Sequence, residues 1–166
     1  GFLPGKRESR RYVGDYIMTQ DDVMNGKIPS DTVAYGGWQM DNHLPGGFWM
    51  DGEGGGHLQK VRLNEPYGIP YRSLYSKNIR NLMFAGRNIS ASHLAFSTTR
   101  VMATCGVIGQ AAGTAAALAV EYGILPADVL AHINELQKRL LDDDCFLPKF
   151  SRKMPELTQK ASLSAD

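Results

Sequence analysis

One segment limits what this chain can fold into more than any other. Twenty consecutive uncharged residues, 101–120, lie between Arg100 and Glu121, and this is the length of a helix that spans a membrane. Polar side chains such as Thr104 interrupt the segment, and many of its other residues are Ala or Gly, which gain little from lipid. No aromatic belt or positively charged loop flanks it. We therefore expect no membrane span, and we predict a helix over residues 100–122 in a folded domain.

Three glycines in this segment share one face of the predicted helix, because Gly106, Gly109 and Gly113 are spaced three and four residues apart. Each glycine in a helix interior costs about 1 kcal/mol relative to alanine. Three on one face indicate that a strand or a ligand approaches more closely than a Cβ atom permits. Tight packing against a sheet, without a ligand, is the alternative. Gly123 is expected to end the helix.

The order of elements before this helix indicates a ligand site. Residues 81–86, NLMFAG, are an apolar run that suits a buried parallel strand, and a polar loop joins them to the helix near Arg100. Ligands of open α/β folds bind beyond the carboxyl ends of the strands. A helix N-terminus offers unpaired N–H groups and a partial positive charge. Such an N-terminus suits an electron-rich ligand edge, like the pyrimidine edge of a flavin.

The first 76 residues predict strands and loops with one short helix. Glycine inside a strand often marks the close approach of another group, and Gly36-Gly37 interrupts the longest strand pattern. The expected elements are a strand at 7–19, a short helix capped by Thr19 or Asp21 and ended by Asn25-Gly26, a strand at 31–49, a glycine-rich hairpin or loop at 50–66 and an irregular extended stretch at 67–76.

A second helix is predicted over residues 127–143, because apolar residues form one stripe along it. After Pro148 the chain has few apolar anchors and is expected to be loosely held. The stripe consists of Val129, Leu130, Ile133, Leu136, Leu140 and Leu141.

Composition excludes some classes of function. The net charge is +1, so we expect no nucleic-acid partner. Cys105 and Cys145 lie far apart and match no metal-binding or disulfide pattern, so we expect no metal site. The opening residues GFLPGKRESRR lack the apolar core of a signal peptide. We expect a soluble protein of the cytoplasm or the periplasm.

Residues 67–119, from YGIPYRSLYS to GTAAALA, resemble the final flavin-contacting segment of a large family of FAD-dependent oxidoreductases, part of the glutathione-reductase-like superfamily in its broadest sense. Residues 7–22, RESRRYVGDYIMTQDD, and residues 36–43, GGWQMDNH, resemble strands of that family's substrate-covering domain. The resemblance extends over residues 7–141. Some bacterial members of the group carry the label xanthan lyase, which the chemistry of these motifs does not support.

The resemblance implies an α/β fold, as an α+β fragment of the family's complete structure. Residues 1–75 would be the β-rich part of the substrate-covering domain, residues 76–147 the carboxyl-terminal strand and helices of the FAD-binding domain, and residues 148–166 a tail. The implied FAD contacts are Gly86 and Arg87 near the ribityl chain or pyrophosphate, Asn88 on a ribityl hydroxyl, Ser92 near the reactive ring, Arg100, Val101 and Met102 at the pyrimidine edge, and Gly106 where the cofactor lies close.

Members of this family bind the ADP half of FAD with a glycine-rich βαβ motif near their amino terminus. The one glycine-rich candidate here, DGEGGGH at residues 51–57, follows no apolar strand and precedes no helix. We therefore expect the chain to be the carboxyl-terminal half of an oxidoreductase, with its amino-terminal FAD-binding half as a missing partner. The chain alone is expected to be inactive and to lack FAD.

Oxidation of a C–H bond by a flavin requires a base that takes a hydroxyl or amine proton. Asp41 and His43 alternate on one strand face, so the carboxylate can orient the imidazole, and the resemblance places His93 in the flavin loop. We predict His43 and His93 as the catalytic pair, with Asp41 as their carboxylate. Structural or exposed histidines are the alternative. His57 and His132 are expected to be solvated, and Arg10, Arg11 and Arg72 are weaker candidates for holding an anionic or polyhydroxylated substrate.

Three functions remain at this point. The first is oxidation of a small organic substrate by hydride transfer to FAD. The second is a non-catalytic binding module without flavin, which would hold a carbohydrate on the aromatic residues Tyr35, Trp38, Phe48 and Trp49. The third is a membrane-anchored interaction protein that uses residues 101–120.

Overall fold

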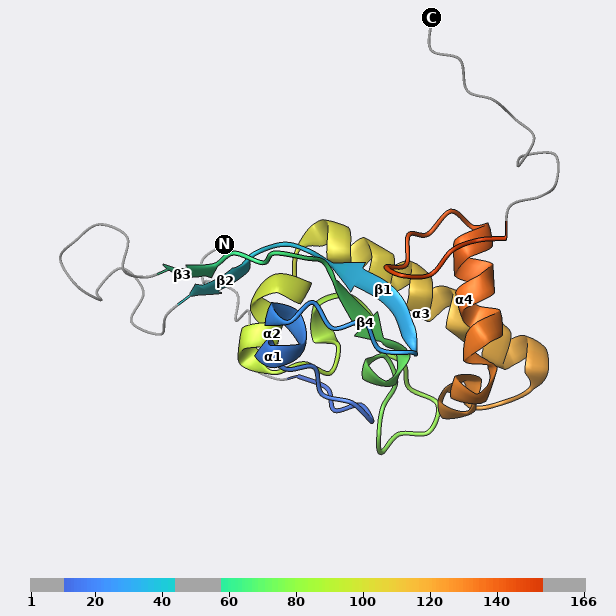
Figure 1. Cartoon of the computed structure of the whole chain (residues 1–166). Helices are drawn as coiled ribbons and strands as arrows, with labels where there is room; N and C mark the ends of the chain where they lie inside the picture. Colours follow the sequence, from blue (N-terminus) through green and yellow to red (C-terminus); the bar gives the residue numbers. More distant parts are fainter. Residues whose placement is uncertain (1–10, 44–57, 154–166) are drawn as a thin grey trace, which may run out of the picture.

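The computed structural model describes residues 11–43 and 58–153. Within those ranges α-helices and small antiparallel sheets combine into a mixed α/β structure (Figure 1), which confirms the predicted fold class. The α-helices are α1 (Gln20–Met24), α2 (His93–Thr99), α3 (Met102–Tyr122) and α4 (Ile133–Asp142), and the strands are β1 (Thr32–Gly36), β2 (Met40–His43), β3 (Leu58–Val61) and β4 (Tyr67–Pro70).

The four strands form one long two-stranded ribbon with a break in it. β1 pairs with β4 and β2 pairs with β3, all antiparallel, and residues 37–39 separate the two parts on one side. The β2–β3 end projects away from α3 and α4, to the left in Figure 1. A Cβ atom on Gly36 would lie 2.2 Å from the hydroxyl of Tyr67, so the predicted close approach at this glycine is confirmed. Residues 44–49 of the predicted strand and residues 50–57 of the predicted loop lie outside the described residues.

Helix α3 is the long helix that the uncharged segment predicts. It begins two residues later than expected and ends at Gly123, whose φ of 65° is the left-handed conformation that favours glycine. One of its faces is buried against β1 and α4. The buried residues are Thr104, Ile108, Ala111, Ala112, Ala115, Leu118 and Ala119.

The glycine face of α3 is the opposite face, which corrects one prediction. A Cβ atom on Gly106, Gly109 or Gly113 would meet no other atom within 4 Å, so no strand of the described residues packs closely there. By length and by a mean hydropathy of 1.4, α3 is the one helix among the described residues that reaches the dimensions of a membrane span. Core helices pass the same test, and its buried face packs on the ribbon and on α4.

Helix α4 lies beside α3, and its buried apolar side chains follow the predicted stripe. The predicted second helix is divided, because residues Pro126–His132 form a 3₁₀ helix and the α-helix begins only at Ile133. Gln137 is 5% exposed and joins α4 to β1. Its Nε2 donates hydrogen bonds to the carbonyl oxygens of Ser30 at 2.8 Å and Thr32 at 2.9 Å.

Gln137→Ala is expected to lower the free energy of unfolding by about 1–3 kcal/mol, because it leaves two carbonyl groups without their donor. Urea denaturation measures this change. Lys138→Ala is the control, since Lys138 is exposed and forms an i,i+4 ion pair with Asp142; its effect should stay within about 0.5 kcal/mol. Equal effects of the two variants would show that the bonds from Gln137 contribute nothing to stability.

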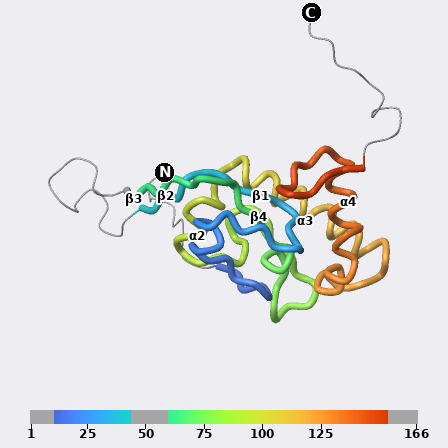
Figure 2. Tube along the Cα trace, viewed as in Figure 1, coloured from blue at the N-terminus to red at the C-terminus, as the bar shows by residue number. Residues whose placement is uncertain are grey.

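Two predicted strands are wrong over the described residues. Residues 11–19 form only a bridge between Met18 and Ala91, and Met18 exchanges backbone hydrogen bonds with Ser90 and Ser92. Figure 2 shows this early segment beside the chain that leads into α2. Residues 81–86 form only an isolated antiparallel bridge between Tyr75 and Met83. An apolar run forms a strand only where a neighbour pairs along its length, and the described residues provide none there.

Candidate active site

Helix α2 positions several candidate residues and was not predicted, because its residues were expected to be a loop. Ser92 is its N-cap, and the Ser92 hydroxyl accepts a hydrogen bond from the backbone N–H of Ala95 at 3.3 Å. Serine is a favoured N-cap, so this residue is the signal that the sequence offered. The Ser92 hydroxyl therefore already caps α2, in addition to its predicted position near a cofactor ring.

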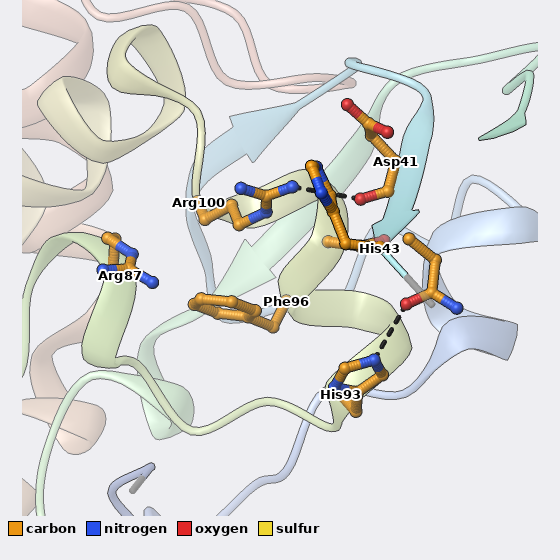
Figure 3. Close-up of a pocket in the computed structure, with 8 residues that line it drawn as sticks. Asp41, His43, Arg87, His93, Phe96 and Arg100 are labelled. Atoms are coloured by element: carbon orange, nitrogen blue, oxygen red, sulfur yellow. Dashed lines mark hydrogen bonds between the residues drawn. The ribbon is translucent and has the colours of Figure 1, made fainter. Parts of the chain in front are cut away.

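A cavity of about 110 Å³ opens between β2, α2 and the 3₁₀ turn Gly86–Asn88 (Figure 3). It contains all three predicted catalytic residues, although they come from segments fifty residues apart. The lining residues are Asp41, Asn42, His43, Arg87, His93, Phe96, Ser97 and Arg100.

His93 is held by a residue that sequence reasoning missed. Its Nε2 lies 2.8 Å from Oδ1 of Asn42, and an amide oxygen only accepts, so Nε2 carries the hydrogen. Asn42 lies between Asp41 and His43 on β2. Side chains alternate along a strand, so the pattern that selected Asp41 and His43 assigns Asn42 to the other face. No pattern in the sequence therefore identified Asn42.

Asp41 and His43 both line the cavity, but no hydrogen bond joins their side chains among the described residues. Oδ1 of Asp41 is buried and has no hydrogen-bond partner there. The predicted orientation of His43 by this carboxylate therefore lacks a direct contact. His43 and His93 are both exposed at the cavity rim.

Two arginines stack on one buried ring in this cavity. Phe96 is 5% exposed, and the guanidinium carbons of Arg87 and Arg100 lie 5.2 and 6.0 Å from its ring centroid. Nη2 of Arg100 also donates to the carbonyl oxygen of Asp41 at 3.1 Å. Figure 3 shows Arg87 and Arg100 beside the ring of Phe96. The cavity therefore has fixed positive charge next to its imidazoles.

The other arginine candidates lie elsewhere. Arg72 binds Asp31 with Nε to Oδ2 at 2.9 Å and Nη2 to Oδ1 at 3.1 Å, and this hydrogen-bonded pair raises the pKa of Arg72. It is a structural ion pair that joins the residue before β1 to the 3₁₀ helix Tyr71–Ser73 after β4. Arg10 and His57 lie outside the described residues, and Arg11 does not line the cavity.

Two of the aromatic candidates for a carbohydrate surface, Tyr35 and Trp38, line one pocket together with residues at the start of α3. The ring of Tyr35 packs edge-on against Phe146, with centroids 5.0 Å apart. Trp38 is 54% exposed. Phe48 and Trp49 lie outside the described residues. His132, expected to be solvated, is exposed and packs edge-on against Tyr122 at 5.0 Å.

The predicted cofactor residues meet at the N-terminus of α3. The turn Gly86–Asn88 packs on α3. Gly86 has a φ of 68°, and a Cβ atom there would touch Cys105 of α3 at 3.9 Å. Arg100, the C-cap of α2, directly precedes Val101, the N-cap of α3. Two separate parts of the predicted set are therefore neighbours in space.

This N-terminus has the properties that the electron-rich edge of a flavin requires. Valine has no side-chain acceptor to cap the first N–H groups, and the first turn of α3 contains no acidic residue. Met102 is 91% exposed, and Gly106, one turn further on, faces open space. The donors and the positive end of the helix dipole are thus accessible, so the residues present fit the group.

The comparison with protein families identifies the family of the chain. Residues 1–140 match the family described as FAD dependent oxidoreductase, so the chain belongs to that family. No curated protein and no solved structure matches the chain.

Proposed function

We propose that this chain forms the flavin-facing and substrate-facing part of an enzyme that oxidises a small organic substrate by hydride transfer to FAD. The proposal rests on one observation, which is that two candidate sites lie next to each other. The cavity with His43 and His93 and the exposed N-terminus of α3 share Arg100, which lines the first and directly precedes the second. In this proposal residues 1–75 belong to the substrate-covering domain and residues 76–147 to the FAD-binding domain.

The cofactor would be held by the residues around the α3 N-terminus. The N–H groups that begin at Val101 and Met102 would bind the pyrimidine edge, and Gly106 leaves room for it. Gly86, Arg87 and Asn88 would bind the ribityl chain or pyrophosphate, and Ser92 would lie near the ring. When bound, FAD supplies the acceptor for a hydride from the substrate.

His93 would take the substrate proton. Because its Nε2 donates to Asn42, the neutral imidazole accepts a proton at Nδ1. The hydrogen bond to Oδ1 of Asn42 also orients the ring. His43 on β2 lines the same cavity and would act on the same proton or on a second substrate group, with Asp41 as the nearest carboxylate along the strand.

We also propose that the ADP half of FAD binds to a segment outside these 166 residues. The described residues would contact only the flavin, the ribityl chain and part of the pyrophosphate. We refer to the chain together with that FAD-binding segment as the complete protein.

The 166-residue chain, purified alone, is expected to be colourless and to bind added FAD weakly, because most contacts to the adenine and pyrophosphate are absent. Absorbance of the purified chain and equilibrium dialysis against FAD measure this. A preparation that is stoichiometrically yellow with a flavin spectrum would show that the cofactor site is placed wrongly.

A further inference from the structure

A second pocket, of about 180 Å³, opens between the end of β1 and the start of α3, and none of the proposed catalytic residues lines it. Residues 35–38 form one wall, and Val101 with residues of the first two turns of α3 forms the other. Every residue that lines the pocket is uncharged. Pockets for drug-sized ligands measure about 300–1,000 Å³, so this one has room for a single small ring.

Trp38 presents a large apolar ring at this pocket. The residue is 54% exposed, although tryptophan is among the side chains that bury the most surface in a contact. Its backbone is fixed, because the fully buried hydroxyl of Thr98 donates a hydrogen bond to the carbonyl oxygen of Trp38. The hydroxyl of Tyr67 lies 3.0 Å from the same Thr98 oxygen. Buried partners of the backbone therefore hold this residue at the surface.

The polar side chain in the pocket is Thr104. The residue is 6% exposed, and among the described residues its hydroxyl forms no hydrogen bond. Polar groups in buried residues normally have a partner, and a hydroxyl offers one donor and two acceptor sites. The backbone N–H groups of Ala103 and Thr104 lie in the first turn of α3, where a helix supplies no partner for them. The pocket therefore combines an apolar ring with unused hydrogen-bonding groups.

We infer that this pocket binds a neutral carbohydrate ring, at a site separate from the proposed oxidation. A pyranose has C–H groups on its faces, which pack on the face of an indole, and hydroxyl groups around its edge. With one face on Trp38, the sugar exchanges hydrogen bonds with the Thr104 hydroxyl and accepts them from the first turn of α3. The uncharged lining favours a neutral sugar over a sugar acid or a sugar phosphate, because a buried charge requires a partner.

The ring that stacks on Trp38 has a second possible source, which is the flavin. Val101 lines this pocket and also begins the helix end to which we assign the pyrimidine edge. The sugar is favoured because the pocket lies on the side of α3 that packs on β1. Gly106, the predicted close contact of FAD, faces open space instead. A test without flavin separates the two sources.

The test is an NMR titration of the ¹⁵N-labelled 166-residue chain without flavin. The probes are the methyl glycosides of glucose, galactose, mannose and xylose. Sorbitol is the control, because it carries hydroxyl groups without a ring. The chain has two tryptophans, so Trp49→Phe assigns the indole N–H signal of Trp38. We expect at least one glycoside to give saturable shifts of this signal and of the Thr104 amide, and sorbitol to give none.

Two variants test the contacts. Trp38→Ala should weaken binding of that glycoside by about tenfold or more, followed at the Thr104 amide, because tryptophan contacts dominate binding energies. Thr104→Val should weaken it by about two- to tenfold, the contribution of one hydrogen bond. Thr114→Val is the matched control, since Thr114 lies on the same helix outside the pocket, and it should leave the affinity unchanged. If Thr104→Val does not fold, Trp38→Ala decides, because it removes an exposed side chain.

The inference is overturned if no glycoside gives a saturable shift, if sorbitol gives equal shifts, or if a folded Trp38→Ala variant keeps its affinity. FMN is the last probe. If FMN binds more tightly than every glycoside and Trp38→Ala weakens it by a similar factor, the ring on Trp38 is the flavin and the carbohydrate assignment is wrong. Because the glycosides are tested without flavin, a complete protein that failed to reduce FAD would leave a measured sugar site intact.

Discussion

His93→Ala in the complete protein is expected to slow the reductive half-reaction by 10²- to 10⁴-fold while FAD remains bound. Loss of a positioned base has an effect of this size, equivalent to about 3–5 kcal/mol of barrier. The residue lines the cavity, and Asn42 fixes its ring through the 2.8 Å hydrogen bond to Nε2. Anaerobic stopped-flow bleaching of the flavin by a turnover substrate measures the rate, and the bound flavin spectrum measures cofactor content.

His43→Ala should behave similarly, and the double variant should lose much less than the product of the single effects if both imidazoles act on one proton. His132→Ala is the matched control, because this exposed histidine packs on Tyr122 away from the cavity. Wild-type reduction by the His93→Ala variant at all pH values would show that His93 is structural. The base would then be His43 or a residue outside the chain.

Gly109→Leu is expected to change stability in opposite directions in the 166-residue chain and in the complete protein. In the 166-residue chain it should raise stability by about 0.5–1 kcal/mol, because leucine is the better helix former and a Cβ atom at Gly109 meets no other atom within 4 Å. In the complete protein the same change should destabilise the fold by about 1–3 kcal/mol or expel FAD, because it overpacks a close contact on the glycine face.

Gly109→Ala provides the graded comparison, since it adds only the Cβ atom. Thermal unfolding of both forms, together with flavin content of the complete protein, gives the two signs. If Gly109→Leu raised the melting temperature of the complete protein and left its FAD occupancy full, neither FAD nor another segment of the protein would contact this face of α3 closely.

Local chemistry made two helices predictable from the sequence. The long uncharged segment predicted the start of α3 to within two residues. Gly123 predicted where the helix ends. The short helix α1 begins after Thr19, whose backbone N–H donates to Oδ2 of Asp22 at 2.9 Å, and ends at Asn25. Both signals lie within a few residues of the helix ends that they determine.

Features that depend on distant partners were not predictable. The apolar run 81–86 matches the composition of a strand, but composition does not supply a neighbouring strand. Helix α2 contains Ser and Thr, which form helices poorly, and burial of its residues Ala95 to Thr99 stabilises it instead. The bond from His93 to Asn42 joins residues 51 positions apart, so only the folded chain reveals it.

The candidate site was predictable in part of its members, because Asn42 and Phe96 were not identified, and its geometry was not predictable. Strand alternation selected His43 and the family resemblance selected His93 and Arg100, and the fold brings all three to one cavity. The resemblance assigned Arg100 to the cofactor edge. Its stacking on Phe96 beside Arg87 is a contact that no single motif contained.

The central claim is that the N-terminus of α3 lies against a flavin. The most direct measurement is the FAD released by acid from the protein purified at its natural length, quantified against protein concentration. The claim predicts about one FAD for each chain, with a flavin spectrum that bleaches when substrate is added. A natural-length protein that is fully folded, releases no flavin and takes up none from added FAD would contradict it.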